Sequence, residues 1–153
     1  MDVTRVSIRP AEPSEAQALT DLALRSKASH GYDDDFMAKA ASELTVSRDY
    51  VADHHVFVID EGGSIGGFYA LILEPPRCDL DLMFIDPDRH GRGYGRVLFE
   101  HAAEEARALG CTEMQIESDP YAVAFYEALG AVQIGESKSR STGRMLPLLR
   151  FAL

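Results

Sequence analysis

The stretch from Cys78 to Leu109 limits the fold of this chain more than any other part of its sequence. It reads CDLDLMFIDPDRHGRGYGRVLFEHAAEEARAL. Leu80, Leu82 and Phe84 alternate with other residues, which predicts a strand on one face of a sheet that ends at Pro87. A turn with three glycines in five residues follows, and after it the apolar residues recur at helical spacing, which predicts a helix. The apolar stripe of this helix is Leu98, Ala102, Ala106 and Leu109. A strand, a glycine-rich turn and a helix in this order are typical of an anion-binding site.

The turn carries Gly91, Gly93 and Gly95. The first turn of a helix leaves backbone N–H groups without partners, and glycine lets an anion approach them closely. A Walker loop is excluded, because Gly95 is followed by Arg96 and Val97 instead of lysine and a hydroxyl residue. The dinucleotide fingerprint is excluded as well, since no third glycine completes G-x-G-x-x-G. The sequence therefore predicts a phosphate site of another kind.

The turn resembles the pyrophosphate-binding loop of the GNAT acyltransferases. In that family, Gln or Arg is followed by two residues, Gly, one residue and then Gly or Ala. The matching residues here are His90, Gly91, Arg92, Gly93, Tyr94 and Gly95. The resemblance continues through Phe84-Ile85-Asp86-Pro87 and through a second signature, DPYAVAFYEALG, from Asp119 to Gly130. Because it covers essentially the whole chain, it implies a single N-acetyltransferase domain over residues 1–153.

The fold that the resemblance implies is an α/β fold with a mixed central sheet. An antiparallel N-terminal meander leads to a parallel central pair that splays at the cofactor site, flanked by about four helices. Residue patterns predict strands over 6–9, 56–60, 65–73, 113–117, 132–135 and 145–151. They predict further helices capped by Ser14 with Gln17, after Asp33, and after Pro120. The polar residues 136–144 are expected to form a mobile hairpin loop.

The chemistry that the resemblance implies is direct transfer of an acetyl group from acetyl-CoA to a primary amine, without metal and without a covalent enzyme intermediate. The pantetheine arm is expected along the central strand, where the N–H of Ile85 would be the oxyanion donor. The pyrophosphate is expected at the glycine turn, with added positive charge from Arg92 and Arg96. The expected cofactor-binding residues are Met83, Phe84, Ile85, His90, Gly91, Arg92, Gly93, Tyr94, Gly95, Arg96, Asp119, Ala122 and Tyr126.

Two kinds of proton transfer are required. An alkylamine with a pKa of ~10 is protonated at neutral pH, so a base must generate the attacking form. Asp79 and Asp81 lie where relatives often carry a glutamate base, and as near neighbours on one strand face they are expected to raise each other's pKa. Alternatively, they are solvated or paired with arginine. Tyr126 occupies the general-acid position of the family, and its phenol is matched in pKa to the leaving thiol.

Three residues depart from the family pattern. His90 replaces Gln or Arg, Asp119 stands where Asn is common, and Ala131 stands where Phe is common. His90 is expected to matter little, because the loop acts through its main chain. Asp119 is a good N-cap, but it brings negative charge nearer to the cofactor.

The acceptor is open at this point. His30 and Tyr32 lie in the segment that in the family forms one wall of the acceptor site, and they either contact substrate or pack against the sheet. Three functions are retained: an N-acetyltransferase for small-molecule amines, one for protein N-termini or lysines, and a non-catalytic acyl-CoA-binding module.

Composition narrows the partners. The chain has 15 basic and 25 acidic residues, a net charge of −10, and no basic stripe, so a nucleic-acid partner is not expected. Its apolar runs are short and its N-terminus lacks an export signal, so we expect no membrane partner and a cytoplasmic location. Cys78 and Cys111 lack metal-ligand spacing and are expected to be reduced core residues, and no metal site is predicted. A homodimer is compatible with the family.

Overall fold

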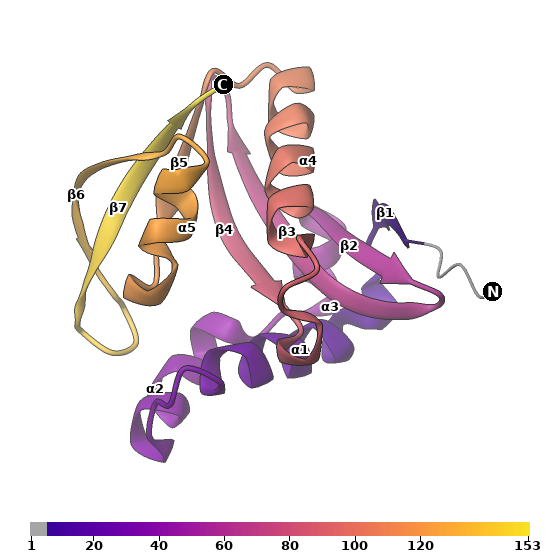
Figure 1. Cartoon of the computed structure of the whole chain (residues 1–153), viewed down its shortest axis with the longest axis vertical. Helices are drawn as coiled ribbons and strands as arrows, with labels where there is room; N and C mark the ends of the chain where they lie inside the picture. Colours follow the sequence, from indigo (N-terminus) through magenta and orange to yellow (C-terminus); the bar gives the residue numbers. More distant parts are fainter. Residues whose placement is uncertain (1–5) are drawn as a thin grey trace.

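The computed structural model of the chain describes residues 6–153. Within this range, seven strands form one mixed sheet in the order β1-β2-β3-β4-β5-β7-β6 (Figure 1). The strands are β1 (Val6–Pro10), β2 (His55–Glu61), β3 (Ser64–Glu74), β4 (Arg77–Ile85), β5 (Glu113–Glu117), β6 (Val132–Lys138) and β7 (Met145–Ala152). The α-helices are α1 (Ala16–Ala28), α2 (Asp34–Leu44), α3 (Arg48–Asp53), α4 (Tyr94–Ala108) and α5 (Val123–Ala128). Short 3₁₀ turns are η1 (Pro13–Glu15), η2 (Pro87–Arg89) and η3 (Pro120–Ala122).

The sheet is antiparallel except at its centre, where β4 and β5 run parallel. These two strands pair only between Arg77–Asp79 and Glu113–Gln115, although β4 continues for six residues to Ile85. Beyond the paired residues the strands diverge, and Figure 1 shows the gap opening toward α1 and α2. The predicted antiparallel meander and splayed parallel pair are confirmed.

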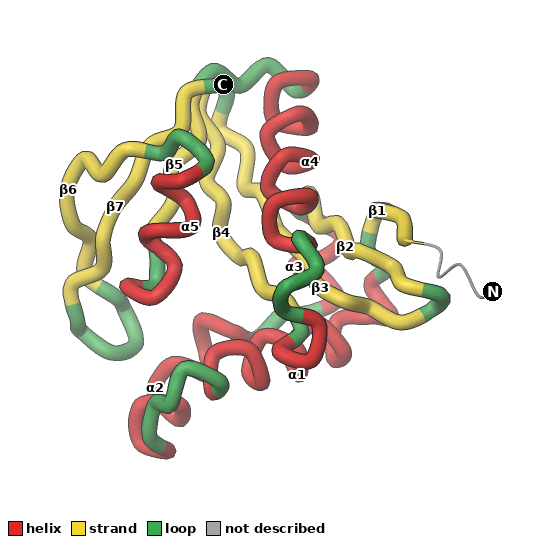
Figure 2. Tube along the Cα trace, in the orientation of Figure 1, coloured by secondary structure: helices red, strands yellow, loops and turns green. Residues whose placement is uncertain are grey.

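Helices cover both faces of the sheet (Figure 2). On one face, α4 and α5 enclose a core that includes Tyr69, Leu98, Met114 and Leu149. On the other face, a second core lies under α1, α2 and α3. It includes Leu19, Leu22, Val58 and Phe68. Because the second core ends at β4, the far half of the sheet has helical cover on one face only.

Strand β4 contributes to both cores. Leu80 lies in the core under α4, whereas Leu82 lies in the core under α1. The strand changes face because of a β-bulge: Leu80 pairs with Leu71 and Leu82 pairs with Ala70, which leaves Asp81 without a partner. The expectation that Leu80 and Leu82 share one face is therefore wrong, since one extra residue reverses the alternation.

Two helix predictions are also wrong. About four helices were expected, but residues 6–153 contain a fifth, the short α3, whose N-cap Ser47 accepts a hydrogen bond from the N–H of Tyr50. Ser14 is not an N-cap, because Pro13 starts η1 one residue earlier. Glu12 and Glu15 form the capping box there. The second helix, expected after Asp33, begins at Asp34, and the side chain of Asp33 is its N-cap.

The hairpin between β6 and β7 differs from the expected mobile loop. Strand β6 extends to Lys138, and Ser139 is buried. The carboxylate of Glu43 in α2 accepts hydrogen bonds from the Ser139 hydroxyl at 3.1 Å and from the Ser141 N–H at 2.9 Å. The hairpin is therefore fastened to α2, a partner too remote in sequence for local patterns to indicate.

Across residues 6–153, none of the helices combines the length and the apolar character that crossing a bilayer requires.

Candidate functional site

The glycine turn forms an uncapped helix start. Gly91 and Gly93 have φ values of 83° and 78°, a left-handed backbone that favours glycine. Gly93 is the N-cap residue of α4 and has no side chain to accept hydrogen bonds from the first helical turn. The first-turn amides, from Tyr94 to Arg96, are thus free to bind an anion, and α4 has no acidic residue in this turn.

A cavity of about 310 Å³ opens in front of these amides. It is lined by Ile85, Arg89, His90, Gly91, Gly93, Tyr94, Gly95, Arg96 and Phe125. Phe125 comes from α5, and its ring would lie 3.1 Å from a Cβ atom on Gly95. Arg89 and Phe125 were missed as site residues, although each directly precedes a residue that the sequence did identify, His90 and Tyr126.

The arginines of the turn differ in their surroundings. Arg92 donates to the carboxylate of Glu61 at 2.7 Å and does not line the cavity. The Tyr94 hydroxyl binds the same carboxylate. Arg96 is exposed and pairs with Glu100 at 2.9 Å. Arg89 lines the cavity as well, and it is paired with Asp86 at 2.9 Å and with Glu61 at 3.8 Å. Arg89 and Arg96 are therefore the cavity arginines, each with a carboxylate partner, and the structure does not direct Arg92 toward the cavity as expected.

The edge of β4 that faces β5 carries unpaired amides. The N–H of Asp86 donates to the carbonyl of Gly66 at 2.9 Å, which fixes which β4 residues bond to β3. Paired residues alternate along an antiparallel ladder, so Phe84 also bonds toward β3. The N–H groups of Met83 and Ile85 consequently point into the gap. Met83 and Ile85 fit the predicted cofactor contact, whereas the main chain of Phe84 does not.

Tyr126 lies on α5 next to this gap. Its side chain is buried against Phe99 and Phe125, with ring centroids 5.8 Å and 5.1 Å away. Burial, and then the negative charge of Asp119, raise the pKa of the Tyr126 phenol above its usual value. The phenol is therefore protonated at neutral pH, as a proton donor must be. Ala122 ends η3, the turn that leads into this helix.

The two candidate bases have different environments. Asp79 lies where β4 and β5 part, and burial raises its pKa, with smaller contributions from Glu74 and Asp81. Arg77, whose Nε lies 3.7 Å away, opposes this shift. Asp81 is the exposed bulge residue, and its carboxylate accepts a hydrogen bond from the Tyr50 hydroxyl. Of the two, Asp79 is the one whose pKa burial raises, and its role as a base stays a prediction.

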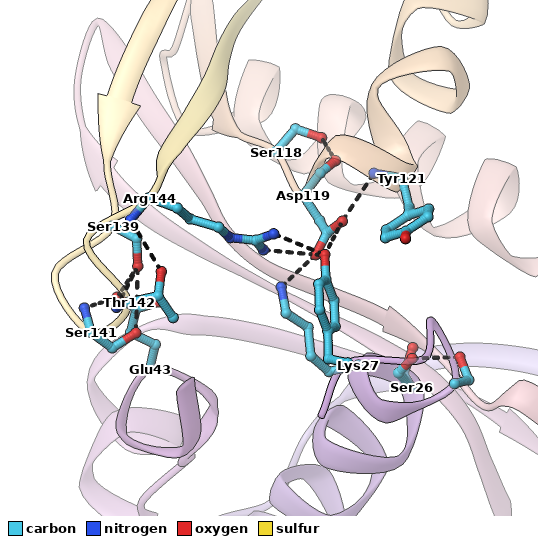
Figure 3. Close-up of polar contacts among 12 residues, drawn as sticks. Ser26, Lys27, Glu43, Ser118, Asp119, Tyr121, Ser139, Ser141, Thr142 and Arg144 are labelled. Carbon is cyan, nitrogen blue, oxygen red and sulfur yellow. Dashed lines mark hydrogen bonds and ion pairs between the residues drawn. The ribbon is translucent and has the colours of Figure 1, made fainter. Parts of the chain in front are cut away.

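Asp119 is the centre of a cluster that joins three separate segments of the chain (Figure 3). Lys27 lies 2.6 Å from its carboxylate, the Tyr32 hydroxyl 2.9 Å and Arg144 3.2 Å. The N–H of Tyr121 completes the N-cap at 2.9 Å. These donors, with the positive charge of Lys27, lower the pKa of Asp119 to about 2 despite its partial burial. We call Lys27, Tyr32, Asp119 and Arg144 the Asp119 cluster.

Aromatic rings surround this cluster. Tyr32 stacks on Phe36 with centroids 4.1 Å apart, and His30 stacks on the exposed Tyr121 at 4.8 Å. Both predicted substrate residues, His30 and Tyr32, thus lie beside Asp119 and not within the sheet core. Their contact with substrate stays a prediction. The cluster itself was missed, because its members are far apart in the sequence.

No group of three or more His, Cys, Asp or Glu side chains in residues 6–153 has a metal-binding arrangement. His54 and His55 are neighbours in the sequence. The ring of His54 packs edge to face with Tyr50, with centroids 4.7 Å apart.

The chain has a cavity at the uncapped start of α4, beside the point where β4 and β5 diverge. Its sequence matches known proteins. Residues 17–131 match the Acetyltransferase (GNAT) family. The chain belongs to this family. Similar GNAT proteins include the peptidyl-lysine N-acetyltransferase YjaB of Escherichia coli, 33% identical over 150 residues, or 96% of each chain. Another is the 5-NmdU N-acetyltransferase of Pseudomonas phage PaMx11, 26% identical over 134 residues, which cover 86% of this chain and 91% of the phage protein.

The fold is found in solved structures as well. The PaiA N-acetyltransferase from Thermoplasma acidophilum, solved in complex with coenzyme A, superposes with a TM-score of 0.79. The match covers 97% of this chain and 99% of that one at 13% sequence identity. At this identity the likeness establishes the GNAT fold. Membership of the family identifies the chain as an acetyl-CoA-dependent acyltransferase.

Proposed function

We propose that this GNAT protein transfers the acetyl group of acetyl-CoA to the primary amine of a small molecule, by direct attack within a ternary complex. The observation that carries the proposal is the unpaired edge of β4, where the amides of Met83 and Ile85 face a gap beside the glycine turn. An extended pantetheine arm can pair with such an edge while the pyrophosphate binds the first-turn amides of α4. Arg89 and Arg96 line the cavity at this turn, where their guanidinium groups can bind phosphate oxygens.

The thioester carbonyl is then polarised by an amide of the β4 edge, with Ile85 as the donor we favour. The amine nitrogen forms a bond to the acetyl carbon and the carbon–sulfur bond breaks. Asp79, directly or through water, takes the proton from the amine, and its raised pKa suits this role. Tyr126 gives its proton to the leaving thiolate and is reprotonated from solvent. The geometry and the family motifs together support these proposed residue roles.

A second acceptor class is favoured by one observation. The relative with 33% identity over 96% of both chains is named a peptidyl-lysine N-acetyltransferase. A lysine in a protein presents the same primary amine, so the chemistry proposed for Asp79 and Tyr126 would be unchanged. A cytoplasmic location, a homodimer and a single domain over residues 1–153 stay predictions, and residues 1–5 lie outside the described range.

The test is release of free thiol from acetyl-CoA in the presence of a panel of amines and lysine-containing peptides. We expect turnover with at least one amine, and loss of roughly 10²-fold or more in kcat for Tyr126→Phe with coenzyme A binding retained. Tyr50→Phe is the matched control, because it also removes one hydroxyl but lies against Asp81. If coenzyme A binds and no amine is acetylated, the chain is an acyl-CoA-binding module instead. If Tyr126→Phe keeps the wild-type rate, Tyr126 is not the acid.

A further inference from the structure

We propose that Lys27 and Arg144 bind a carboxylate on the acceptor, so that the acceptor is a small molecule carrying both an amine and a carboxylate. This inference rests on the proposed acetyl transfer to an amine, and it assigns a substrate class to that site.

The Asp119 carboxylate has used its acceptor positions. A carboxylate offers about four lone-pair positions. Asp119 fills them with four donors: Lys27, the Tyr32 hydroxyl, Arg144 and the Tyr121 N–H. The Tyr32 oxygen in turn accepts from Arg144 at 2.9 Å. The neighbouring carboxylate of Glu43 is engaged by the hairpin through Ser139 and Ser141.

The same cluster has donors to spare. Within residues 6–153, Lys27 makes one hydrogen bond with its three N–H groups, to Asp119. Arg144 places one bond on Tyr32 and one on Asp119, and its Nε is buried without a partner. A buried donor without a partner is costly. A group that supplies only acceptors, such as a carboxylate, would satisfy these donors without displacing Asp119.

The cluster is also reachable. The side chains of Lys27 and Arg144 keep 14% and 26% of their surface exposed, and Figure 3 shows both directed at Asp119, Lys27 from α1 and Arg144 from the β6–β7 hairpin. The stacked rings of Tyr32 and Phe36 lie under the Arg144 guanidinium, with centroids 5.0 Å and 4.7 Å away, and hold it in place. A guanidinium and an ammonium group beside each other suit an acceptor that ends in a carboxylate.

The position of the cluster relates it to the reaction. The cavity at the glycine turn opens beside α4 and α5, on one face of the sheet. Lys27 and Tyr32 come from the α1–α2 segment, whose helices pack on the other face. The charge of Asp119 reaches Tyr126, where it is the second cause of the raised pKa. A molecule that enters from the α1–α2 side would thus place its carboxylate on the cluster and its amine toward the gap.

The experiment compares acceptors that differ only in the carboxylate. ω-Amino acids with three to five methylenes are assayed beside their carboxamides, by thiol release from acetyl-CoA. For wild type we expect kcat/KM about 10- to 100-fold higher for the acid than for its amide, mostly through KM. Arg144→Gln and Lys27→Gln should each bring this ratio close to one, mostly by raising KM for the acid. Arg140→Gln, an exposed arginine of the same hairpin, should keep the wild-type ratio.

A readout without turnover separates this inference from the proposed function. The Arg144 Nε–H resonance is followed by NMR in the coenzyme A complex, with pentanoate and pentanamide as probes. We expect a shift with pentanoate only, and no shift of the neighbouring signals in Arg144→Gln. Acetylation of amines with equal preference for acid and amide, or no response to pentanoate, would overturn the carboxylate site and leave the acetyltransferase intact. A pentanoate response without any amine turnover would instead count against the proposed function alone.

Discussion

A Cβ atom placed on Gly95 would lie 3.1 Å from the ring of Phe125, so α4 and α5 meet at a point that has no room for a side chain. Gly95 belongs to the uncapped first turn of α4, and Phe125 precedes Tyr126 on α5. This one contact therefore sets the distance between the amides that would hold a pyrophosphate and the phenol that would protonate a thiolate. The third glycine of the motif is required by this packing and not by its backbone angle.

Substituting Gly95 should weaken binding of acetyl-CoA. Gly95→Val forces the Phe125 ring away, and overpacking of this kind costs about 1–3 kcal/mol. We expect KM for acetyl-CoA to rise by roughly tenfold or more, measured by thiol release at saturating amine. Gly135→Ala is the control, because a Cβ atom there meets nothing within 4 Å. A Gly95→Val enzyme with unchanged KM would show that the Phe125 contact does not shape the cofactor site.

The two aspartates of β4 should differ in their effect on rate. Asp79→Asn removes the carboxylate whose pKa is raised by burial at the parting of β4 and β5. We expect kcat/KM to fall by about 10²- to 10⁴-fold. Asp81→Asn should stay within about threefold, because Asp81 is an exposed residue bound to Tyr50 and its loss is a surface change.

The pH profile tests the same assignment. A base works when ionised, so the wild-type rate should fall as pH drops through the pKa of Asp79, which lies above the usual 3.8. In Asp81→Asn the midpoint of this acidic limb should lie at a lower pH than in wild type, because the charge of Asp81 contributes to the raised pKa of Asp79. If Asp79→Asn keeps the acidic limb of wild type, the base is another group.

Local patterns predicted the parts of the fold whose causes are local. The glycine turn, the strand 113–117 and the helix that follows Asp33 each depend on neighbours a few residues away. The bulge at Asp81 could not be predicted, because an extra residue in β4 becomes visible only when β3 pairs with it. The bulge places Leu80 and Leu82 on opposite faces of the sheet, and it gives Asp79 and Asp81 different environments.

The Asp119 cluster could not be predicted from the sequence for a related reason. Lys27 and Asp119 are 92 positions apart, and Tyr32 and Arg144 are 112 apart. The only sequence signal was that an aspartate stands where the family often has asparagine. Two cations from distant segments neutralise that aspartate, which answers the concern that its charge would oppose the cofactor.

The two thiols should be inert in the folded protein. Cys78 and Cys111 are buried, and burial, followed by the nearby Cys111, raises the pKa of the Cys78 thiol to about 12. A thiol reacts as its thiolate, so labelling with a disulfide reagent should require unfolding. We expect no rapid thiol release from the reagent in native buffer and two equivalents in denaturant. Fast labelling of the native protein would mean that the core under α4 opens readily.

Acid should abolish the contribution of Asp119 to stability. Its pKa is lowered from 3.8 to about 2, so the unfolded chain binds the proton more readily than the folded one. Stability gained from this carboxylate is therefore complete above pH 4 and is lost as pH falls toward 2; a shift of this size corresponds to about 2 kcal/mol. We expect Asp119→Asn to lower the free energy of urea unfolding by about that amount at pH 7.

The difference in the free energy of unfolding between wild type and Asp119→Asn should become smaller as the pH is lowered below 4. The reason is that a protonated Asp119 resembles the asparagine that replaces it. Asp21→Asn, at an exposed position on α1, should stay within about 0.5 kcal/mol of wild type throughout. A difference for Asp119→Asn that persists unchanged at the lowest pH would mean that the cluster stabilises the fold through packing of Tyr32 and Phe36, and that its ion pairs with Lys27 and Arg144 contribute little.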